Sequence, residues 1–140
     1  MFKEYYSRRF QEIFGSPLEV TDGLGFEAVQ AKLAERQLKI PQALIDYYTL
    51  AGQHLINKEH NRLLSIEELN WIDSKLVFMQ ENQCVVYWGI DQADINKQNP
   101  VIWQGINGDV IEWHEESYKL SQFIMAMWKW LVTGEQEEPE

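Results

Sequence analysis

The chain has little cysteine and few cationic side chains. Its one cysteine, Cys84, cannot close a disulfide within the chain, so nothing in the sequence argues for an oxidising compartment. Only 12 Lys and Arg stand against 22 Asp and Glu in 140 residues, which gives a net charge of −10. This balance argues against a nucleic-acid partner, because phosphates require neutralisation by lysine and arginine. It suits a basic partner protein, or simply solubility.

Long hydrophobic runs are also missing. The longest strongly apolar stretch, residues 123–132, is interrupted by Lys129 and falls far below the ~20 residues that a membrane span needs. Residues 1–9 are charged and have no apolar core, unlike a secretory signal. We therefore predict a cytoplasmic protein that does not enter a membrane. The 45 % of apolar residues still suffices for a hydrophobic core, which excludes a disordered chain.

The first third of the chain has the apolar spacing of helices, and the later part that of strands. Helices are predicted near 2–14, 26–38 and 41–52, with residues 53–74 polar and irregular. In that polar stretch, Ser65 and Glu68 form a capping-box pattern, which predicts a short helix from Ile66. Strands are predicted at 76–80, 84–90, 101–104 and 110–113, and a closing helix from Ser117 to about Val132.

Asn107-Gly108 is a strong signal for a two-residue hairpin turn. A turn there would place Ile102 opposite Trp113 and Trp103 opposite Glu112. One face would then be the core side, carrying Ile102, Ile106, Ile111 and Trp113. The other would be a mixed face that meets water or a partner, carrying Val101, Trp103, Val110, Glu112 and His114. In the preceding hairpin, the same parity argument puts Cys84 on an apolar face with Val86 and Trp88, as an inert buried thiol.

No motif predicts catalysis or cofactor binding. Gly23-Leu-Gly25-Phe-Glu-Ala28 matches a dinucleotide fingerprint, but no βαβ pattern surrounds it, which favours an Asp22-Gly23 turn that leads into a helix. The three histidines do not have the spacing of metal ligands. His114 precedes Glu115 and Glu116; a catalytic His–Glu pair is one interpretation, and acidic residues at a helix N-terminus is the favoured one. We predict no metal, no cofactor and no enzymatic activity.

Tryptophan is abundant, with six in the chain. Trp128 and Trp130 diverge by about 200° on a helix, so only Trp128 can face the core. Exposed tryptophans are either protein-interaction anchors or a second core layer under the N-terminal helices, and the sequence leaves both open.

Two acids at the end of a strand, Asp91 and Asp94, are either ligand-binding or solvated. The predicted partner-binding residues are Asp91, Asp94, Trp103, Glu112 and His114.

Several segments together resemble the SUKH superfamily. The segment from Ile40-Pro41 through Tyr47-Tyr48 to Gly52 is similar to its opening helix. Leu63-Leu-Ser-Ile-Glu-Glu-Leu69 is similar to its short segment before the sheet, and Val85-Val-Tyr-Trp-Gly89 to a central strand. The resemblance covers about residues 26–132 and lies in the order and spacing of these segments. The chain departs from the family in its Glu81-Asn-Gln83 turn, where glycine and aspartate are common.

The resemblance implies an α+β fold without a catalytic centre. Combined with the residue patterns, it predicts a single domain over residues 1–134, with a central, mostly antiparallel sheet of about four to six strands. N-terminal helices and a C-terminal helix pack on that sheet, and residues 135–140 form an acidic disordered tail. Many bacterial members are thought to be immunity proteins that neutralise toxins, often nucleases, and fungal relatives are linked to cell-wall glucan synthesis.

We therefore expect a protein-binding domain that neutralises a toxin, with a basic nuclease as one such partner. The alternatives are a regulator or scaffold of cell-wall synthesis, and an enzyme that uses His114.

Overall fold

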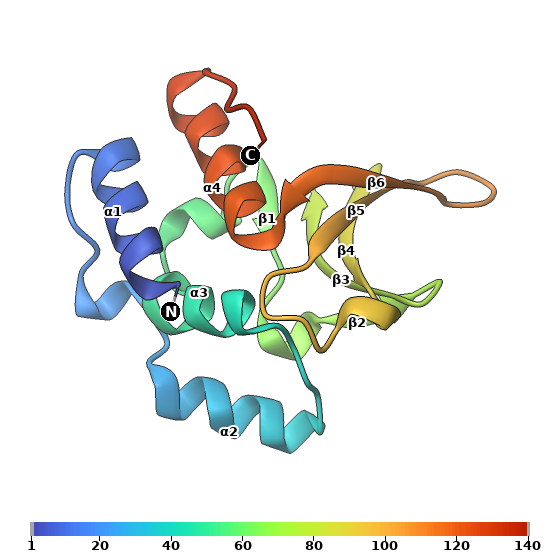
Figure 1. The fold of residues 1–140 in the computed structure, drawn as a ribbon, viewed down its shortest axis with the longest axis horizontal. Coiled ribbons are helices and arrows are strands. Elements are labelled where there is room, and N and C mark those ends of the chain that lie inside the picture. Colours follow the sequence, from blue (N-terminus) through green and yellow to red (C-terminus); the bar gives the residue numbers. More distant parts are fainter. Residues whose placement is uncertain (1, 140) are drawn as a thin grey trace.

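The computed structural model describes residues 2–139 as one α+β unit, as predicted (Figure 1). The helices gather at one end of the molecule and the strands at the other. The helices are α1 (Lys3–Phe14), α2 (Phe26–Arg36), α3 (Gln42–Ala51) and α4 (Leu120–Thr133), with short 3-10 turns η1 (Val20–Asp22), η2 (Leu55–Lys58), η3 (Ile66–Glu68) and η4 (Gln92–Asp94). The strands are β1 (Asn61–Leu63), β2 (Asn70–Ile72), β3 (Lys75–Glu81), β4 (Val86–Asp91), β5 (Val101–Ile106) and β6 (Glu112–Lys119).

The strands form one antiparallel sheet in the order β1-β3-β4-β5-β6, and β2 pairs with β3 beside β1. Both β1 and β2 lie in the stretch 53–74, which was predicted to be irregular. Each has only three residues, too few for an alternating pattern to be visible. The short helix predicted between them is confirmed as η3, where the backbone N–H of Ser65 donates to the Glu68 carboxylate at 3.0 Å.

The core lies where α1, α3 and α4 meet each other and the sheet. The indole N–H of Trp128 donates to the Tyr47 hydroxyl at 2.8 Å, and that hydroxyl donates to the Asn57 side-chain oxygen at 2.6 Å. Burial raises the pKa of the Tyr47 hydroxyl, because its ionised form would lose contact with water. Both aromatic rings are fully buried, so this chain of hydrogen bonds joins α4 to α3 across the centre of the molecule.

The glycine motif before α2 has a packing role. The N–H groups of Leu24 and Gly25 donate to the carbonyls of Tyr48 and Thr49, at the C-terminal end of α3. A Cβ at Gly23 would lie 2.0 Å from the Thr49 carbonyl oxygen, and Gly25 has a φ of +85°. Residues 15–25 contain only the 3-10 turn η1 and no strand. The predicted turn leading into a helix is thereby confirmed, and the glycines allow it to lie against α3.

Both hairpins differ from their predicted register. In the first, a bulge between Val77 and Met79 changes the alternation of β3, so that Leu76 pairs with Ile90 while Met79 pairs with Trp88. In the second, Ile106 pairs with Glu112, and residues 107–111 form a longer loop instead of a two-residue turn. The N–H of Asn107 donates to the Val85 carbonyl at 2.8 Å, so Asn107 is held by the β3–β4 turn.

The closing helix begins three residues later than predicted. Ser117 lies in β6, and Lys119 is the N-cap of α4. The strand continues this far because Val101 pairs with Lys119 and the N–H of Leu120 donates to the Pro100 carbonyl. Glu115 and Glu116 are consequently strand residues, so the interpretation as acids at a helix N-terminus is wrong. The predicted end at about Val132 is confirmed, since α4 ends at Thr133 and Gly134 caps it with a φ of +77°.

The acidic C-terminal segment folds back onto the domain. The Glu137 carboxylate pairs with Arg9 at 2.5 Å, and the Tyr118 hydroxyl donates to the Glu137 carbonyl. The side-chain amide of Gln122 donates to the Glu138 carbonyl at 3.2 Å. Over the described part, residues 135–139, this packing differs from the disordered tail that the composition predicts.

Cys84 is exposed, and its prediction as a buried thiol is wrong. It lies in the β3–β4 turn with a φ of +57°, before β4 begins, so strand alternation does not apply to it.

We expect the Cys84 thiol of the folded protein to react with dithionitrobenzoate at a rate within about tenfold of that in the urea-unfolded chain, because thiol reactivity follows exposure. The rate of thiolate release measures this, and a Cys84 that reacts only after unfolding would contradict the structure.

Candidate protein-binding face

The structure separates the predicted partner-binding residues instead of placing them on one surface. Trp103 pairs with Glu115, whereas His114 pairs with Gln104 and Glu112 with Ile106. Because adjacent strand residues point to opposite faces, Trp103 is on one side of the sheet, and Glu112 and His114 are on the other. The prediction that Trp103, Glu112 and His114 share one face is therefore wrong. The loop between β5 and β6 has five residues in place of the predicted two, and this odd difference moves Trp103 to the side of the sheet opposite Glu112 and His114.

Trp103 and Asp91 belong to a cluster on the side of the sheet away from α4. The Lys75 ammonium lies 2.9 Å from the Asp91 carboxylate and 4.7 Å from the centre of the Trp103 ring. It is also 5.6 Å from the Trp113 ring, whose N–H donates to Asp73 at 3.2 Å. The hydrogen bond from Lys75 lowers the pKa of Asp91. The charges of Lys75 and Asp91 are satisfied within the cluster, which gives Asp91 a structural role in this arrangement.

Two glycines make room for that cluster. Gly89 pairs with both Val77 and Trp103, and Gly105 pairs with Trp113. A Cβ at Gly105 would lie 2.7 Å from the Trp113 ring, so the indole lies directly over the backbone there. The ammonium and indoles consequently pack close to the sheet, which leaves Trp103 half-buried.

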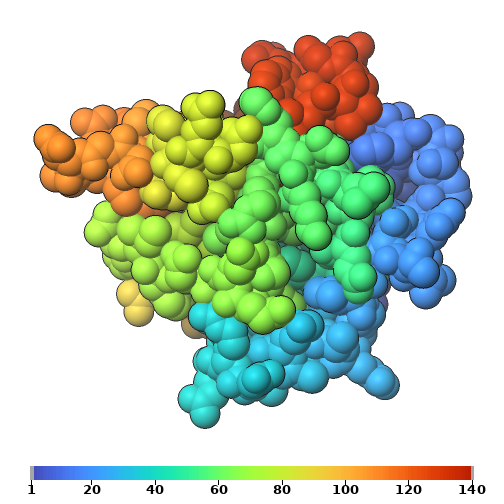
Figure 2. Space-filling view, turned by 180° about the vertical axis from the view of Figure 1, so that it is seen from behind, coloured from blue at the N-terminus to red at the C-terminus, as the bar shows by residue number. Residues whose placement is uncertain are grey.

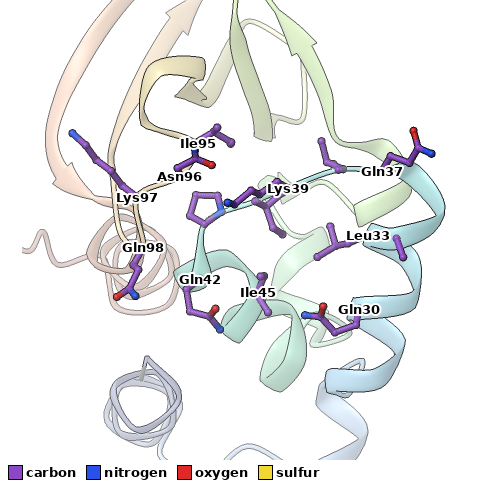
Figure 3. A pocket seen from close by; sticks show the side chains of 14 residues that line it. Gln30, Leu33, Gln37, Lys39, Gln42, Ile45, Ile95, Asn96, Lys97 and Gln98 are labelled. Atoms are coloured by element: carbon purple, nitrogen blue, oxygen red, sulfur yellow. The ribbon is translucent and has the colours of Figure 1, made fainter.

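Asp94 lies apart both from the cluster of Trp103 and Asp91 and from Glu112 and His114. It ends η4, in the connection between β4 and β5, and its carboxylate lies 3.0 Å from the Lys97 ammonium. Lys97 lines a pocket of about 500 Å³ between α2, α3 and this connection (Figure 3). We call it the amide pocket, because glutamines and Asn96 supply most of its polar groups; its only charged lining residues are Lys39 and Lys97.

The side of the sheet on which α4 packs is only partly covered. Near α4, the Trp88 ring lies 5.7 Å from the Phe123 ring, and Ile90 and Ile102 are fully buried. Beyond α4 the same side of the sheet is not covered by a helix. It continues as an open face towards the loop of residues 107–111, which forms the tip of the β5–β6 hairpin. That tip projects from one end of the molecule (orange, Figure 2). The open face is formed by Val86, Gln104, Ile106, Glu112, His114 and Glu116.

This open face combines apolar side chains with acidic ones. Ile106 is 42 % exposed, and Val110 in the loop beyond it is 77 % exposed. The Glu112 carboxylate lies 3.9 Å from the His114 ring, and both side chains are exposed. Glu116 is partly buried; burial raises its pKa, although His114 acts in the opposite direction. An exposed apolar patch with a polar rim is typical of a protein-interaction site.

A pocket of about 440 Å³ adjoins the open face where the sheet meets α4. Val86, Trp88 and Gln104 reach it from the sheet, and Phe123 and Trp130 from α4. Tyr118 and the C-terminal Glu137 complete one side. We call this the aromatic pocket. Trp130 is 45 % exposed and Trp128 fully buried, which confirms the divergence predicted from helix geometry.

Sequence reasoning missed Gln104, Tyr118 and Glu116 as surface candidates. Tyr118 lines the aromatic pocket because β6 continues to Lys119, whereas the predicted strand ended at 113. Gln104 reaches the pocket from β5, and Glu116 lies on the open face. The exposed position of Trp130 was the one available signal for this region.

Comparison of the chain with protein-family models, with curated proteins and with solved structures found no match. Within residues 2–139, no helix has the length and apolar character to cross a bilayer. Over the same residues, no three His, Cys, Asp or Glu side chains are grouped as a metal ion would require.

Proposed function

We propose that this chain is a non-enzymatic protein-binding domain of the immunity type, which binds and neutralises a basic toxin through the open face and the aromatic pocket. The observation that carries this proposal is the continuity of the two surfaces on one side of the sheet, where Val86 and Gln104 belong to both. Together they offer exposed apolar groups for burial and carboxylates for recognition, the two components of a typical protein interface.

The charge of the chain supports a basic partner. Its net charge of −10 attracts a cationic protein at long range, and complementary charges accelerate association. The open face carries Glu112 and Glu116 without a lysine or arginine. The order of segments that resembles the SUKH superfamily supports the immunity role, since neutralisation of a toxin requires binding and no chemistry by the immunity protein.

The experiment is co-expression with the proteins encoded by adjacent genes. We expect one of them to inhibit growth alone, and to form a stoichiometric complex with this chain that restores growth. The double variant Ile106→Asp with Glu112→Lys should weaken the complex at least about tenfold, because it removes an apolar contact and inverts a charge.

The matched control is Val20→Asp with Glu19→Lys, which makes the same kind of change, a β-branched apolar residue to Asp and Glu to Lys, in the connection between α1 and α2. Val20 is 98 % exposed, so this pair should leave both folding and binding unchanged. Equal affinity of the two double variants for the toxin would reject the open face as the binding site. An adjacent envelope-synthesis protein that binds this chain, in place of a toxin, would support the regulatory alternative.

A further inference from the structure

The aromatic pocket has the composition of a site for an organic cation. Its walls include the rings of Trp88, Tyr118, Phe123 and Trp130. Two of these rings pack against Phe123, with Trp88 at 5.7 Å and Tyr118 at 6.3 Å between ring centres. Aromatic faces carry partial negative charge and attract ammonium and guanidinium groups within about 6 Å. The volume of about 440 Å³ lies within the range of about 300–1,000 Å³ that is usual for ligand pockets.

The charges in this pocket also favour a cation. Its lining contains the carboxylates of Glu81 and Glu137 and neither lysine nor arginine. Glu137 is already paired, with the Arg9 guanidinium at 2.5 Å and the Lys129 ammonium at 3.8 Å. Glu81, at the end of β3, forms no ion pair within residues 2–139, and its carboxylate is available to an incoming charge. The amide pocket has the opposite character, with two lysines and no carboxylate.

We propose that the aromatic pocket receives an arginine or lysine side chain of the partner. This inference rests on the proposed function, because the partner is the basic protein that the open face binds. The side chain enters beside Gln104, its aliphatic part packs against Val86 and Phe123, and its cationic end lies between the aromatic rings and the Glu81 carboxylate. The pocket therefore supplies the central anchor, and the open face supplies the surrounding contacts.

The test uses the isolated protein and small probes. The indole N–H signals of the tryptophans are followed by ¹H–¹⁵N NMR during titration with Nα-acetyl-arginine methylamide and its lysine counterpart. The corresponding citrulline amide is the control, since it has nearly the same shape as arginine and no charge. We expect the cationic probes to shift the Trp130 signal and to leave that of Trp71 unchanged. Trp71 is a fair internal control, because it is 44 % exposed on β2, outside this pocket.

The variant Glu81→Gln should weaken binding of the cationic probes by about three- to tenfold, because it removes the charge and keeps the shape. Glu19→Gln is the matched control and should have no effect. Equal shifts with the citrulline and arginine probes, or no shift of Trp130 with any probe, would overturn the proposal.

The same variant separates this inference from the proposed function. If Glu81→Gln weakens the toxin complex as well as the probe, both proposals are supported. If it weakens neither while Ile106→Asp with Glu112→Lys disrupts the complex, the pocket proposal fails and the binding face stands. If neither set of variants affects the complex, both proposals fail.

Discussion

Replacement of Trp128 by alanine should lower the free energy of unfolding by about 3–5 kcal/mol, which is the usual cost of removing a large buried aromatic side chain. The indole is fully buried between α4 and α3. Its removal opens a cavity. It also removes the indole N–H that donates a hydrogen bond to the Tyr47 hydroxyl at 2.8 Å. Urea unfolding followed by far-ultraviolet circular dichroism measures the change.

Trp130→Ala is the matched control, two residues along the same helix. Its side chain is 45 % exposed, so we expect a loss below about 1 kcal/mol, as for most surface substitutions. This pair tests the orientation of α4, on which the shape of the aromatic pocket depends. Equal losses of stability in the two variants would mean that α4 is rotated relative to the structure described above.

A second large effect is expected at the Lys75–Asp91 pair. Asp91→Ala should lower the free energy of unfolding by about 2 kcal/mol, less than for a fully buried ion pair, because Asp91 is partly exposed but its removal leaves the largely buried Lys75 ammonium unpaired. The Lys75 side chain is only 11 % exposed, and that of Asp91 27 %. Asp94→Ala is the control: its partner, Lys97, is 67 % exposed, and such pairs contribute about 0–1 kcal/mol.

Two further measurements define the role of Asp91. Lys75→Met in the Asp91→Ala background should recover part of the lost stability, since it removes the unpaired charge. Folding lowers the pKa of Asp91, so the ionised carboxylate stabilises the folded protein. This gain in the free energy of unfolding is complete above the ordinary carboxyl pKa of about 3.9 and is lost as the pH falls below that value. Wild type should therefore lose its advantage over Asp91→Ala in acid. Equal effects of the Asp91 and Asp94 substitutions would contradict the structural role of Asp91.

The fold could be predicted from the sequence where periodicity extends over many residues. The apolar spacing from Leu120 to Leu131 fixes both the inner side of α4 and the exposure of Trp130. The predicted ends of the first and last helices are also close to those of α1 and α4, because Gly15 and Gly134 follow them and each adopts a positive φ that other residues avoid.

The candidate site could not be predicted as well, because faces of a strand depend on pairing parity. A two-residue turn at Asn107-Gly108 would put Trp103 and Glu112 on the same side of the sheet, and the five-residue loop puts them on opposite sides. The loop is held by long-range contacts, such as the hydrogen bond from Asn107 to Val85, which sequence spacing does not reveal. The bulge in β3 has the same effect on Val77, and the left-handed turn at Cys84 exposes a residue that alternation would bury. Such local irregularities leave little trace in composition or spacing.

Hydrogen–deuterium exchange of the chain, free and bound to the toxin encoded beside it, would locate the binding surface. We expect slower exchange on binding in residues 104–118 and 126–137, which carry most of the open face and part of the aromatic pocket. Protection confined to α2, α3 and the β4–β5 connection, with 104–118 unchanged, would contradict it and place the partner on the amide pocket instead.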